Sequence, residues 1–104
     1  MSHKINKIRE IVQGNQHRFT LHAVERIIER DIQPDEIKEA ILNGEIIENY
    51  PEDKYGPSCL ICGTCNNKIL HIQCSIEPMW IITAYDPTLC PDKWDKKFKQ
   101  RKSI

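Results

Sequence analysis

No apolar run in the sequence is long enough to cross a bilayer, and the N-terminal stretch MSHKINKIRE lacks the apolar core of a secretory signal. We therefore expect a cytoplasmic protein without a membrane partner. The five cysteines are an odd number, so they do not form a closed disulfide framework. Free thiols in a reducing compartment fit this count better.

The sequence also lacks a net charge, because Lys and Arg together number 15 and so do Asp and Glu. The charges are nevertheless unevenly placed. Residues 1–30 carry six basic and three acidic side chains, residues 31–60 carry two and eight, and residues 91–104 have a net charge of plus four. The two basic ends could meet in space to attract nucleic acid, although the neutral total makes this partner less expected.

The chain of 104 residues is 39% apolar and 29% charged, which is an ordinary globular composition. A chain of this length is expected to build one hydrophobic core. We therefore predict a single domain over residues 1–104, with a basic tail over residues 92–104.

The N-terminal part of the chain has the periodicity of helices. Apolar residues recur at helical spacing from Ile5 to Val12, and Gly14 follows them. Thr20 is a candidate N-cap for a second helix, and Pro34 suits the first turn of a third helix that Gly44 ends. The predicted buried stripe of the second helix comprises Leu21, Val24, Ile27 and Ile28.

The remaining chain changes to period-two patterns and short apolar runs, which predict strands. The predicted strands are Glu45–Tyr50, Ser58–Cys62, Lys68–Cys74 and Trp80–Tyr85. Short links between them favour antiparallel pairing. The predicted fold is α+β, with two or three N-terminal helices packed on a four-stranded, mainly antiparallel sheet. The tail from Asp92 to Lys102 is predicted to form a short helix anchored by Trp94 and Phe98.

The cysteine spacing Cys59-x-x-Cys62-x-x-Cys65 resembles that of metal sites. In a strand, however, an offset of three places Cys59 and Cys62 on opposite faces. Cys74 and Cys90 could complete a ligand set only if the strand prediction failed. We therefore favour thiols that act as small apolar side chains, and we expect no metal and no cofactor.

Three polar side chains share one face of the second predicted helix, because His22, Arg26 and Arg30 stand at i, i+4 and i+8. Arginine matches phosphate geometry, and histidine titrates near neutral pH, so the face suits a phosphate site with an acid or base. The alternative is a solvated face with ion pairs to the neighbouring Glu25 and Glu29.

The last predicted strand contains a second group of polar residues. Alternation sends Thr83 and Tyr85 to one face, and Ile82 and Ala84 to the other. A tyrosine hydroxyl can donate to a phosphoryl oxygen or take part in proton transfer. The alternative is a sheet tyrosine whose hydroxyl lies in water.

The segments FTLHAVERIIERDI, KILHIQC and WIITAYDP, in this order, resemble a bacterial family called domain of unknown function 4258. The resemblance covers about Phe19 to Trp94. The order of helices and strands in this family is similar to that of the small ribonuclease toxins of the RelE-like, MqsR-like and BrnT-like families. Some relatives lie beside a zinc-finger antitoxin. The resemblance thus implies RNA and a small antitoxin protein as partners, but it implies no set of catalytic residues.

We therefore predict a metal-independent endoribonuclease toxin of a type II toxin–antitoxin pair. The candidate catalytic residues are His22, Arg26, Arg30, His71, Thr83 and Tyr85. One of the two histidines would act as base or acid, the arginines would hold the phosphoryl charge, and the last two residues would orient it. Two alternatives remain: a non-catalytic module that binds a basic partner through the acidic stretch Asp35 to Asp53, and a small metal or redox protein that uses the clustered cysteines.

Overall fold

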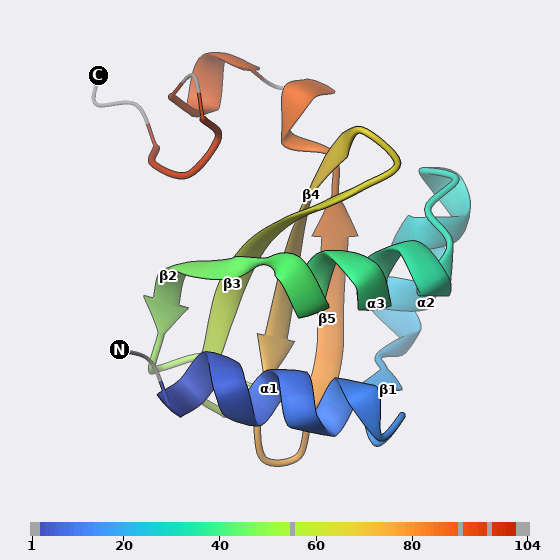
Figure 1. Cartoon of the computed structure of the whole chain (residues 1–104), viewed down its shortest axis with the longest axis vertical. Coiled ribbons are helices and arrows are strands. Elements are labelled where there is room, and N and C mark those ends of the chain that lie inside the picture. Colours follow the sequence, from blue (N-terminus) through green and yellow to red (C-terminus); the bar gives the residue numbers. More distant parts are fainter. Residues whose placement is uncertain (1–2, 55, 90, 96, 102–104) are drawn as a thin grey trace.

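A computed structural model describes residues 3–54, 56–89, 91–95 and 97–101 of the chain (Figure 1). It contains three helices packed on a five-stranded sheet, so the predicted α+β class is confirmed. The helices are α1 (His3–Gln13), α2 (Leu21–Glu29) and α3 (Pro34–Asn43). The strands are β1 (Arg18–Phe19), β2 (Glu45–Tyr50), β3 (Ser58–Cys65), β4 (Lys68–Ser75) and β5 (Trp80–Tyr85), followed by the 3-10 turns η1 (Pro87–Leu89) and η2 (Pro91–Lys93). Within these ranges no helix has the length and apolar character that crossing a membrane requires.

The sheet has the strand order β1-β5-β4-β3-β2. Strands β2 to β5 follow one another as an antiparallel meander, as predicted. The fifth strand was not predicted, because β1 has two residues and no detectable period. Arg18 and Phe19 pair in parallel with Trp80 and Ile81, and this pairing fixes the chain just before α2 begins.

The hairpin between β3 and β4 is tighter than the sequence suggested. Strand β3 continues past the predicted end at Cys62 to Cys65, and Asn66 and Asn67 alone make the turn. Their φ angles are 50° and 64°. Two residues with positive φ give a turn whose twist matches that of antiparallel strands, and asparagine tolerates this conformation.

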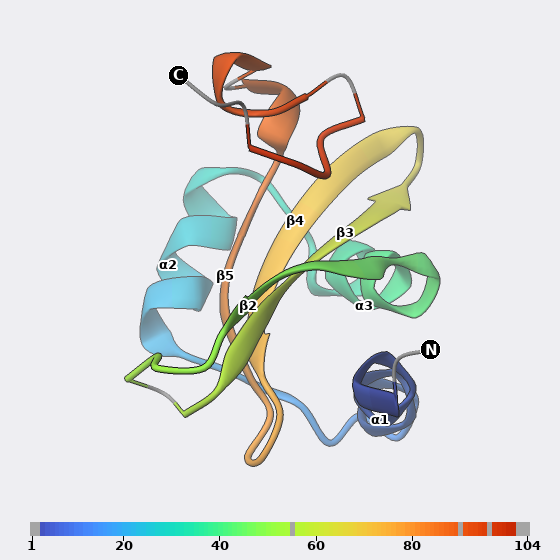
Figure 2. The same ribbon diagram turned by 90° about the vertical axis from the view of Figure 1, so that its left-hand side faces the viewer.

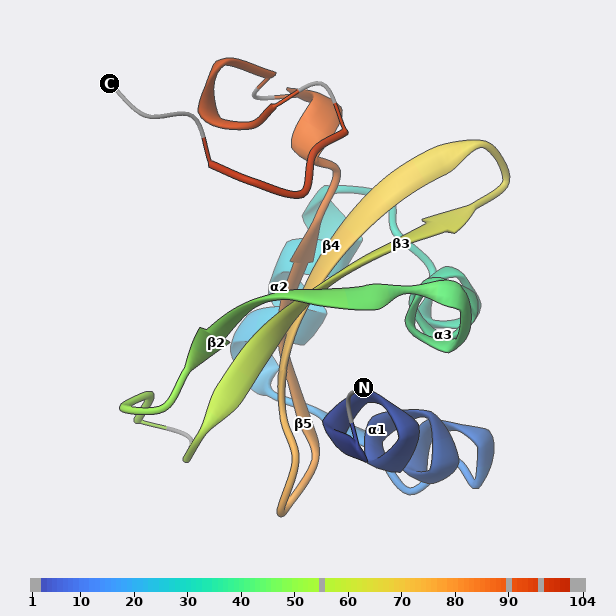
Figure 3. The same ribbon diagram turned by 60° about the vertical axis from the view of Figure 1, so that its left-hand side comes forward.

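Local capping positions the helices where the sequence predicts them. The Ala23 amide donates to Thr20 Oγ1 at 3.0 Å, so Thr20 is the N-cap of α2. Pro34 is the first residue of α3, and Gly44 ends that helix. These caps define α2 and α3 as separate helices, and their different orientations are visible in Figures 2 and 3.

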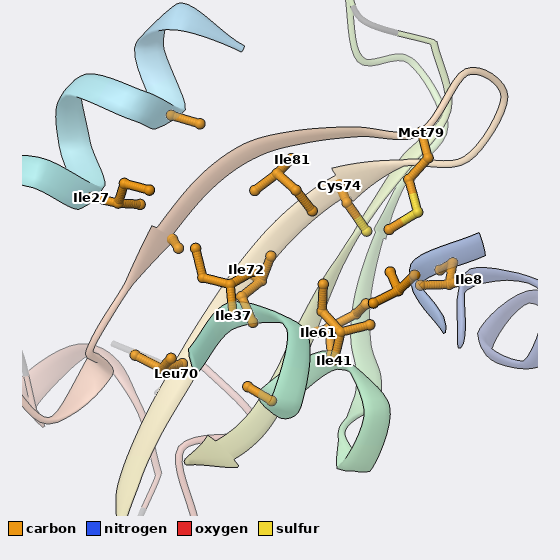
Figure 4. Packing of buried hydrophobic residues seen from close by; sticks show 14 of the residues in the cluster. Ile8, Ile27, Ile37, Ile41, Ile61, Leu70, Ile72, Cys74, Met79 and Ile81 are labelled. Atoms are coloured by element: carbon orange, nitrogen blue, oxygen red, sulfur yellow. The ribbon is translucent and has the colours of Figure 1, made fainter. Parts of the chain in front are cut away.

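One face of the sheet, here called the core face, is apolar and packs against the helices (Figure 4). Gly63 shows how closely α3 approaches it, because a Cβ atom at this position would lie 1.8 Å from the carbonyl oxygen of Ala40. The core face comprises Cys59, Ile61, Leu70, Ile72, Cys74, Ile81 and Ala84. From the helices, Ile8, Ile27, Ile37 and Ile41 pack onto it.

The predicted buried stripe of α2 is wrong in three of its four positions. Ala23 and Ile27 face the core, whereas the exposed fractions of Leu21, Val24 and Ile28 are 76%, 37% and 72%. The apolar residues of this helix form one broad arc that includes Ala23, so periodicity alone left open which edge of the arc faces the core. Contact with β5 places Ala23 and Ile27 on the inner side, and the three exposed residues face outward.

A β-bulge also changes the face assignment in β5. Gln73 pairs with Thr83, but the next residue, Cys74, pairs with Ile81, so Ile82 is an extra residue in β5. Ile81 therefore joins the core cluster with Ala84, whereas Ile82, which simple alternation placed on the same face as Ala84, is buried outside that cluster. Beyond the bulge the alternation holds, and Thr83 and Tyr85 share one face as predicted.

Candidate functional site

The face of the sheet opposite the core face is here called the polar face. Strand register places Cys62, His71 and Tyr85 in one row across β3, β4 and β5. Gln73 and Thr83 lie in the adjacent row. Along each strand the residues of the polar face alternate with those of the core face, so each is a sequence neighbour of a core-face residue.

The polar face is covered by residues 86–89, 91–95 and 97–101, here called the C-terminal segment (Figures 1 and 2). Trp94 is buried and forms an isolated bridge with Arg101. The Asp95 carboxylate accepts the amides of Lys97 and Lys99 at 3.2 and 3.0 Å and so holds a loop. Hence the described part of the predicted tail helix, up to residue 101, is not an α-helix, and only Asp92 and Lys93 belong to the 3-10 turn η2. Lys96 and Lys102 lie outside the described residues.

A cavity of about 420 Å³ opens between α2, the end of β5 and the C-terminal segment. This volume lies within the range of small-ligand sites. The lining residues are Arg30, Tyr85, Asp86, Leu89, Lys93, Trp94 and Arg101. Three are cationic and two are aromatic, and the single carboxylate is occupied by the amide and hydroxyl of Thr88 at 2.9 and 2.6 Å. The cavity therefore suits an anionic ligand with a planar group.

Two arginines of the cavity are held by contacts of different kinds. Arg30, the C-cap residue of α2, donates from Nη1 to the carbonyl oxygen of Ala84 at 2.8 Å. Arg101 forms a two-point ion pair with Glu48, from Nε to Oε2 at 2.8 Å and from Nη2 to Oε1 at 3.1 Å. The guanidinium of Arg101 also lies 4.7 Å from the Trp94 ring centroid. Both cations are thus fixed before a ligand arrives, which lowers the entropy lost on binding.

His71 lies beneath the cavity and is fully buried. Its Nε2 is 2.6 Å from the carbonyl oxygen of Phe98, and its Nδ1 is 3.2 Å from the Tyr85 hydroxyl. Because a carbonyl oxygen only accepts, Nε2 carries a proton; in the neutral ring Nδ1 then accepts from Tyr85. The ring also packs edge-to-face against Trp94, with centroids 4.3 Å apart. The C-terminal segment thus fixes both the orientation and the tautomer of His71.

Burial sets the resting protonation state of this pair. Burial lowers the pKa of His71, although the Phe98 carbonyl and Glu48 act in the opposite direction. Burial raises the pKa of Tyr85, while Arg101 and Arg30 act to lower it. At neutral pH the phenol is therefore protonated and the imidazole is neutral, which is the arrangement of a hydroxyl donor bound to a base.

The structure brings together three of the six predicted site residues. Arg30 and Tyr85 line the cavity, and His71 contacts Tyr85. Arg26 instead pairs with Glu29 at 2.7 Å, as the alternative for this helix face anticipated. His22 is exposed on the first turn of α2 and, like the partly buried Thr83, is outside the cavity lining.

Five lining residues of the C-terminal segment were missed as site residues: Asp86, Leu89, Lys93, Trp94 and Arg101. A tryptophan within a lysine-rich stretch is the signal that could have found them. The sequence was interpreted there as a helix anchored by apolar residues. Because of that interpretation, Trp94 was not expected to lie near Tyr85 in β5.

The cysteines do not converge within the described part of the chain. Cys59 lies on the core face opposite Cys74, whereas Cys62 lies on the polar face opposite His71, as the strand prediction required. Among the described residues no group of three or more His, Cys, Asp or Glu side chains is placed to hold a metal ion. Cys90 lies outside the described residues.

Comparison with known proteins gave one match. A family model described as "Domain of unknown function (DUF4258)" matches residues 19–86. The match begins where the sequence resemblance does and ends before Trp94, so it includes Arg30, His71 and Tyr85 but leaves out most of the C-terminal segment. Neither curated proteins nor solved structures gave a match.

Proposed function

The chain belongs to the DUF4258 family, which carries no defined activity, and we propose from its geometry that it is an endoribonuclease whose site is the cavity at Tyr85. The observation that carries the proposal is the Tyr85–His71 hydrogen bond at the base of a cavity with cationic and aromatic walls. The likeness to small ribonuclease toxins and the pairing with an antitoxin belong to the same proposal.

The cavity composition favours RNA over a purely anionic small molecule. Arg30, Lys93 and Arg101 supply charge for a phosphodiester, and Trp94 and Tyr85 supply ring surfaces for a base. Unpaired bases stack on aromatic side chains, and this recognition targets single strands. We therefore propose single-stranded RNA as the substrate.

Cleavage would use the 2′-hydroxyl of the RNA as nucleophile. Its oxygen attacks the adjacent phosphorus, its proton passes to the Tyr85 oxygen, and the Tyr85 proton passes to Nδ1 of His71. The P–O5′ bond breaks and the 5′ oxygen takes a proton from water. The hydroxide that remains takes back the proton from His71 by way of Tyr85, so a 2′,3′-cyclic phosphate is left and both side chains return to their starting state. Arg30 and Arg101 stabilise the charge that develops on the phosphoryl oxygens.

The alternative of a module that binds basic partners has less support. Its acidic stretch is partly neutralised within the chain, because Glu36 pairs with Lys68, Glu45 with Lys99, and Glu48 with Arg101. The acidic side chains of this stretch thus stabilise the protein's own lysines and arginines.

The experiment compares two arginines of α2 that differ in their relation to the cavity. A single-stranded oligoribonucleotide is incubated with the protein in chelator, and products ending in cyclic phosphate are counted. Arg30→Ala should lower the cleavage rate about a hundredfold, whereas Arg26→Ala should leave it nearly unchanged, because only Arg30 lines the cavity.

A DNA oligonucleotide of the same sequence is the substrate control, since it lacks the nucleophile and should remain intact. Equal losses for the two variants would move the site to the exposed face of α2. Intact RNA with the folded wild-type protein would contradict the proposed function.

A further inference from the structure

A second hollow lies beside the cavity at Tyr85. It has a volume of about 640 Å³, and its lining comprises Gln73, Arg101 and residues 49–53 in the last part of β2 and the loop that follows. Arg101 lines both this hollow and the cavity, so the two spaces are neighbours. In Figures 2 and 3 the loop after β2 lies on the side of the sheet away from α1 and α3. We call this space the Gln73 hollow.

The side-chain amide of Gln73 has a fixed orientation. Its Nε2 donates to Asp53 Oδ2 at 2.7 Å and to Ser58 Oγ at 3.2 Å. The buried Ser58 donates its hydroxyl proton to the same Asp53 oxygen at 2.6 Å. Because a carboxylate only accepts, the nitrogen of the Gln73 amide faces Asp53, and the amide oxygen Oε1 faces away from it. The amide is thus held in place before a ligand arrives.

The groups that the Gln73 hollow offers to a ligand are hydrogen-bond acceptors. Oε1 of Gln73 accepts, and the two amide protons of this side chain are already used by Asp53 and Ser58. Glu52 lines the hollow with an exposed carboxylate, which is an acceptor as well. An amide oxygen and a carboxylate together match a ligand that presents adjacent N–H donors.

The donors around the Gln73 hollow are bound within the protein. The Tyr50 hydroxyl donates to Glu48, and Arg101 donates to Glu48 through Nε and Nη2. Strand register places the side chain of Asn49 on the core-face side, where it accepts from Lys4 at 2.8 Å. The chemistry of the hollow is therefore set mainly by its acceptors.

Among the four RNA bases, guanine presents the most donors on one edge. Its Watson–Crick edge has an N1–H group beside an N2 amino group, whereas adenine and cytosine each have one amino group there and uracil has one N–H group. A hollow that offers mainly acceptors therefore favours guanine.

The separation of the two spaces suits adjacent nucleotides. Gln73 lies two residues from His71 along β4, which is about 7 Å, and both residues belong to the polar face. Neighbouring bases of an extended single strand can span this separation. A strand whose phosphodiester lies in the cavity at Tyr85 can therefore place the next base in the Gln73 hollow.

We propose that the Gln73 hollow is a base-binding subsite that selects guanine in the nucleotide next to the cleaved phosphodiester. The Gln73 oxygen and the Glu52 carboxylate accept the N–H groups of the guanine edge. Arg101, which lines both spaces, holds the phosphate that joins the two nucleotides. The position next to the cleaved bond rests on the proposed RNA function, whereas the binding of guanine does not.

The test measures the binding of 2′-O-methyl hexanucleotides, which cannot be cleaved because their 2′ oxygens are blocked. One is a uridine hexamer, and the others carry a single guanosine, inosine or adenosine at the third position. Their affinities for the wild-type chain are measured by fluorescence anisotropy. The guanosine hexamer should bind at least about tenfold more tightly than the adenosine and uridine hexamers. Inosine keeps the N1–H group but lacks the amino group, so its affinity should lie between.

Three variants of the chain locate the contact, and circular dichroism checks that each is folded. Gln73→Leu keeps the size of the side chain but removes the acceptor, and it should lower the ratio of guanosine to adenosine affinity to about threefold or less. Glu52→Ala should lower this ratio as well, and its exposed position leaves the fold intact. Thr83→Val is the matched control, because Thr83 lies opposite Gln73 but lines neither space, and it should keep the wild-type preference.

Equal affinities of the guanosine and adenosine hexamers, binding of no hexamer, or a preference that both Gln73→Leu and Glu52→Ala retain would overturn the subsite. Cleavage is measured separately with the unblocked guanosine hexamer. A guanosine preference without cleavage would support the subsite and contradict the nuclease, whereas cleavage with no base preference would do the reverse. The two proposals can therefore fail independently.

Discussion

The two faces of the sheet are built from the same strands but are buried in different ways. His71 and Ile72 are sequence neighbours in β4, and both are fully buried. Ile72 lies among aliphatic side chains under the helices, whereas His71 is held by the Tyr85 hydroxyl, the Phe98 carbonyl and the Trp94 ring. Burial against helices supplies the core. Burial beneath the C-terminal segment supplies an oriented titratable group beside a cavity, so burial alone does not separate core residues from site residues.

The largest expected loss of stability is on the core face. Ile72→Ala should lower the free energy of unfolding by about 2–5 kcal/mol, because it removes buried methyl groups and leaves a cavity that the packed helices cannot fill. Urea denaturation followed by circular dichroism measures this loss. A loss smaller than that caused by changing its neighbour His71 would break the proposed difference between the faces.

A smaller loss is expected on the polar face. His71→Leu keeps an apolar body but leaves the Phe98 carbonyl and the Tyr85 hydroxyl without this partner, which should cost about 1–3 kcal/mol. Because Trp94 contacts His71, its fluorescence should change as well. Unchanged stability and unchanged tryptophan emission would show that the C-terminal segment does not depend on this histidine.

The pH dependence of stability should also distinguish the polar face from the core face. Burial lowers the pKa of His71, so at mildly acid pH the folded chain binds fewer protons than the unfolded chain, and its stability should fall as the pH drops below about 6.5. The wild-type melting temperature should therefore decrease more than that of His71→Leu between pH 7.5 and about 5.5. The pKa of His17 is lowered too, first by burial and then by Lys38, so His17→Gln is the matched control. Parallel profiles for wild type and His71→Leu would contradict this account.

The smallest effect is expected at the edge of the C-terminal segment. Arg101→Ala removes the ion pair with Glu48 and the contact with Trp94, but more than half of the arginine side chain is exposed. Such pairs contribute about 1 kcal/mol or less, and salt weakens them. Thermal unfolding at low and high salt should show a small difference from wild type that shrinks with salt. A loss of stability as large as that of Ile72→Ala would mean that the C-terminal segment stabilises the fold as strongly as the core face does.

The helices and strands could be predicted from the sequence better than the contacts between them. The Thr20 cap, the Pro34 start and the strand alternation depend on near neighbours, and each is present. The orientation of α2 depends on its contact with β5, and the Ile82 bulge depends on register with β4. Such contacts between distant segments leave no local period in the sequence.

The candidate site was likewise predicted only in part. Arg30, His71 and Tyr85 were identified from residue chemistry, and the fold brings them together. Arg26 was grouped with Arg30 because helical spacing cannot show which of two arginines meets Glu29 and which meets the carbonyl of Ala84. Trp94 reaches His71 through a loop shaped by Asp95, and no periodic pattern encodes such a loop.

The central claim is that the polar face does chemistry through the Tyr85 hydroxyl, and the rate of RNA cleavage by Tyr85→Phe tests it most directly. Tyr50→Phe is the matched control, because Tyr50 donates to Glu48 on the same face but lies outside the cavity lining. The account predicts a loss of about a hundredfold or more for Tyr85→Phe, with a melting temperature only a few degrees lower, and little change in rate for Tyr50→Phe. Cleavage by Tyr85→Phe at the wild-type rate would contradict it.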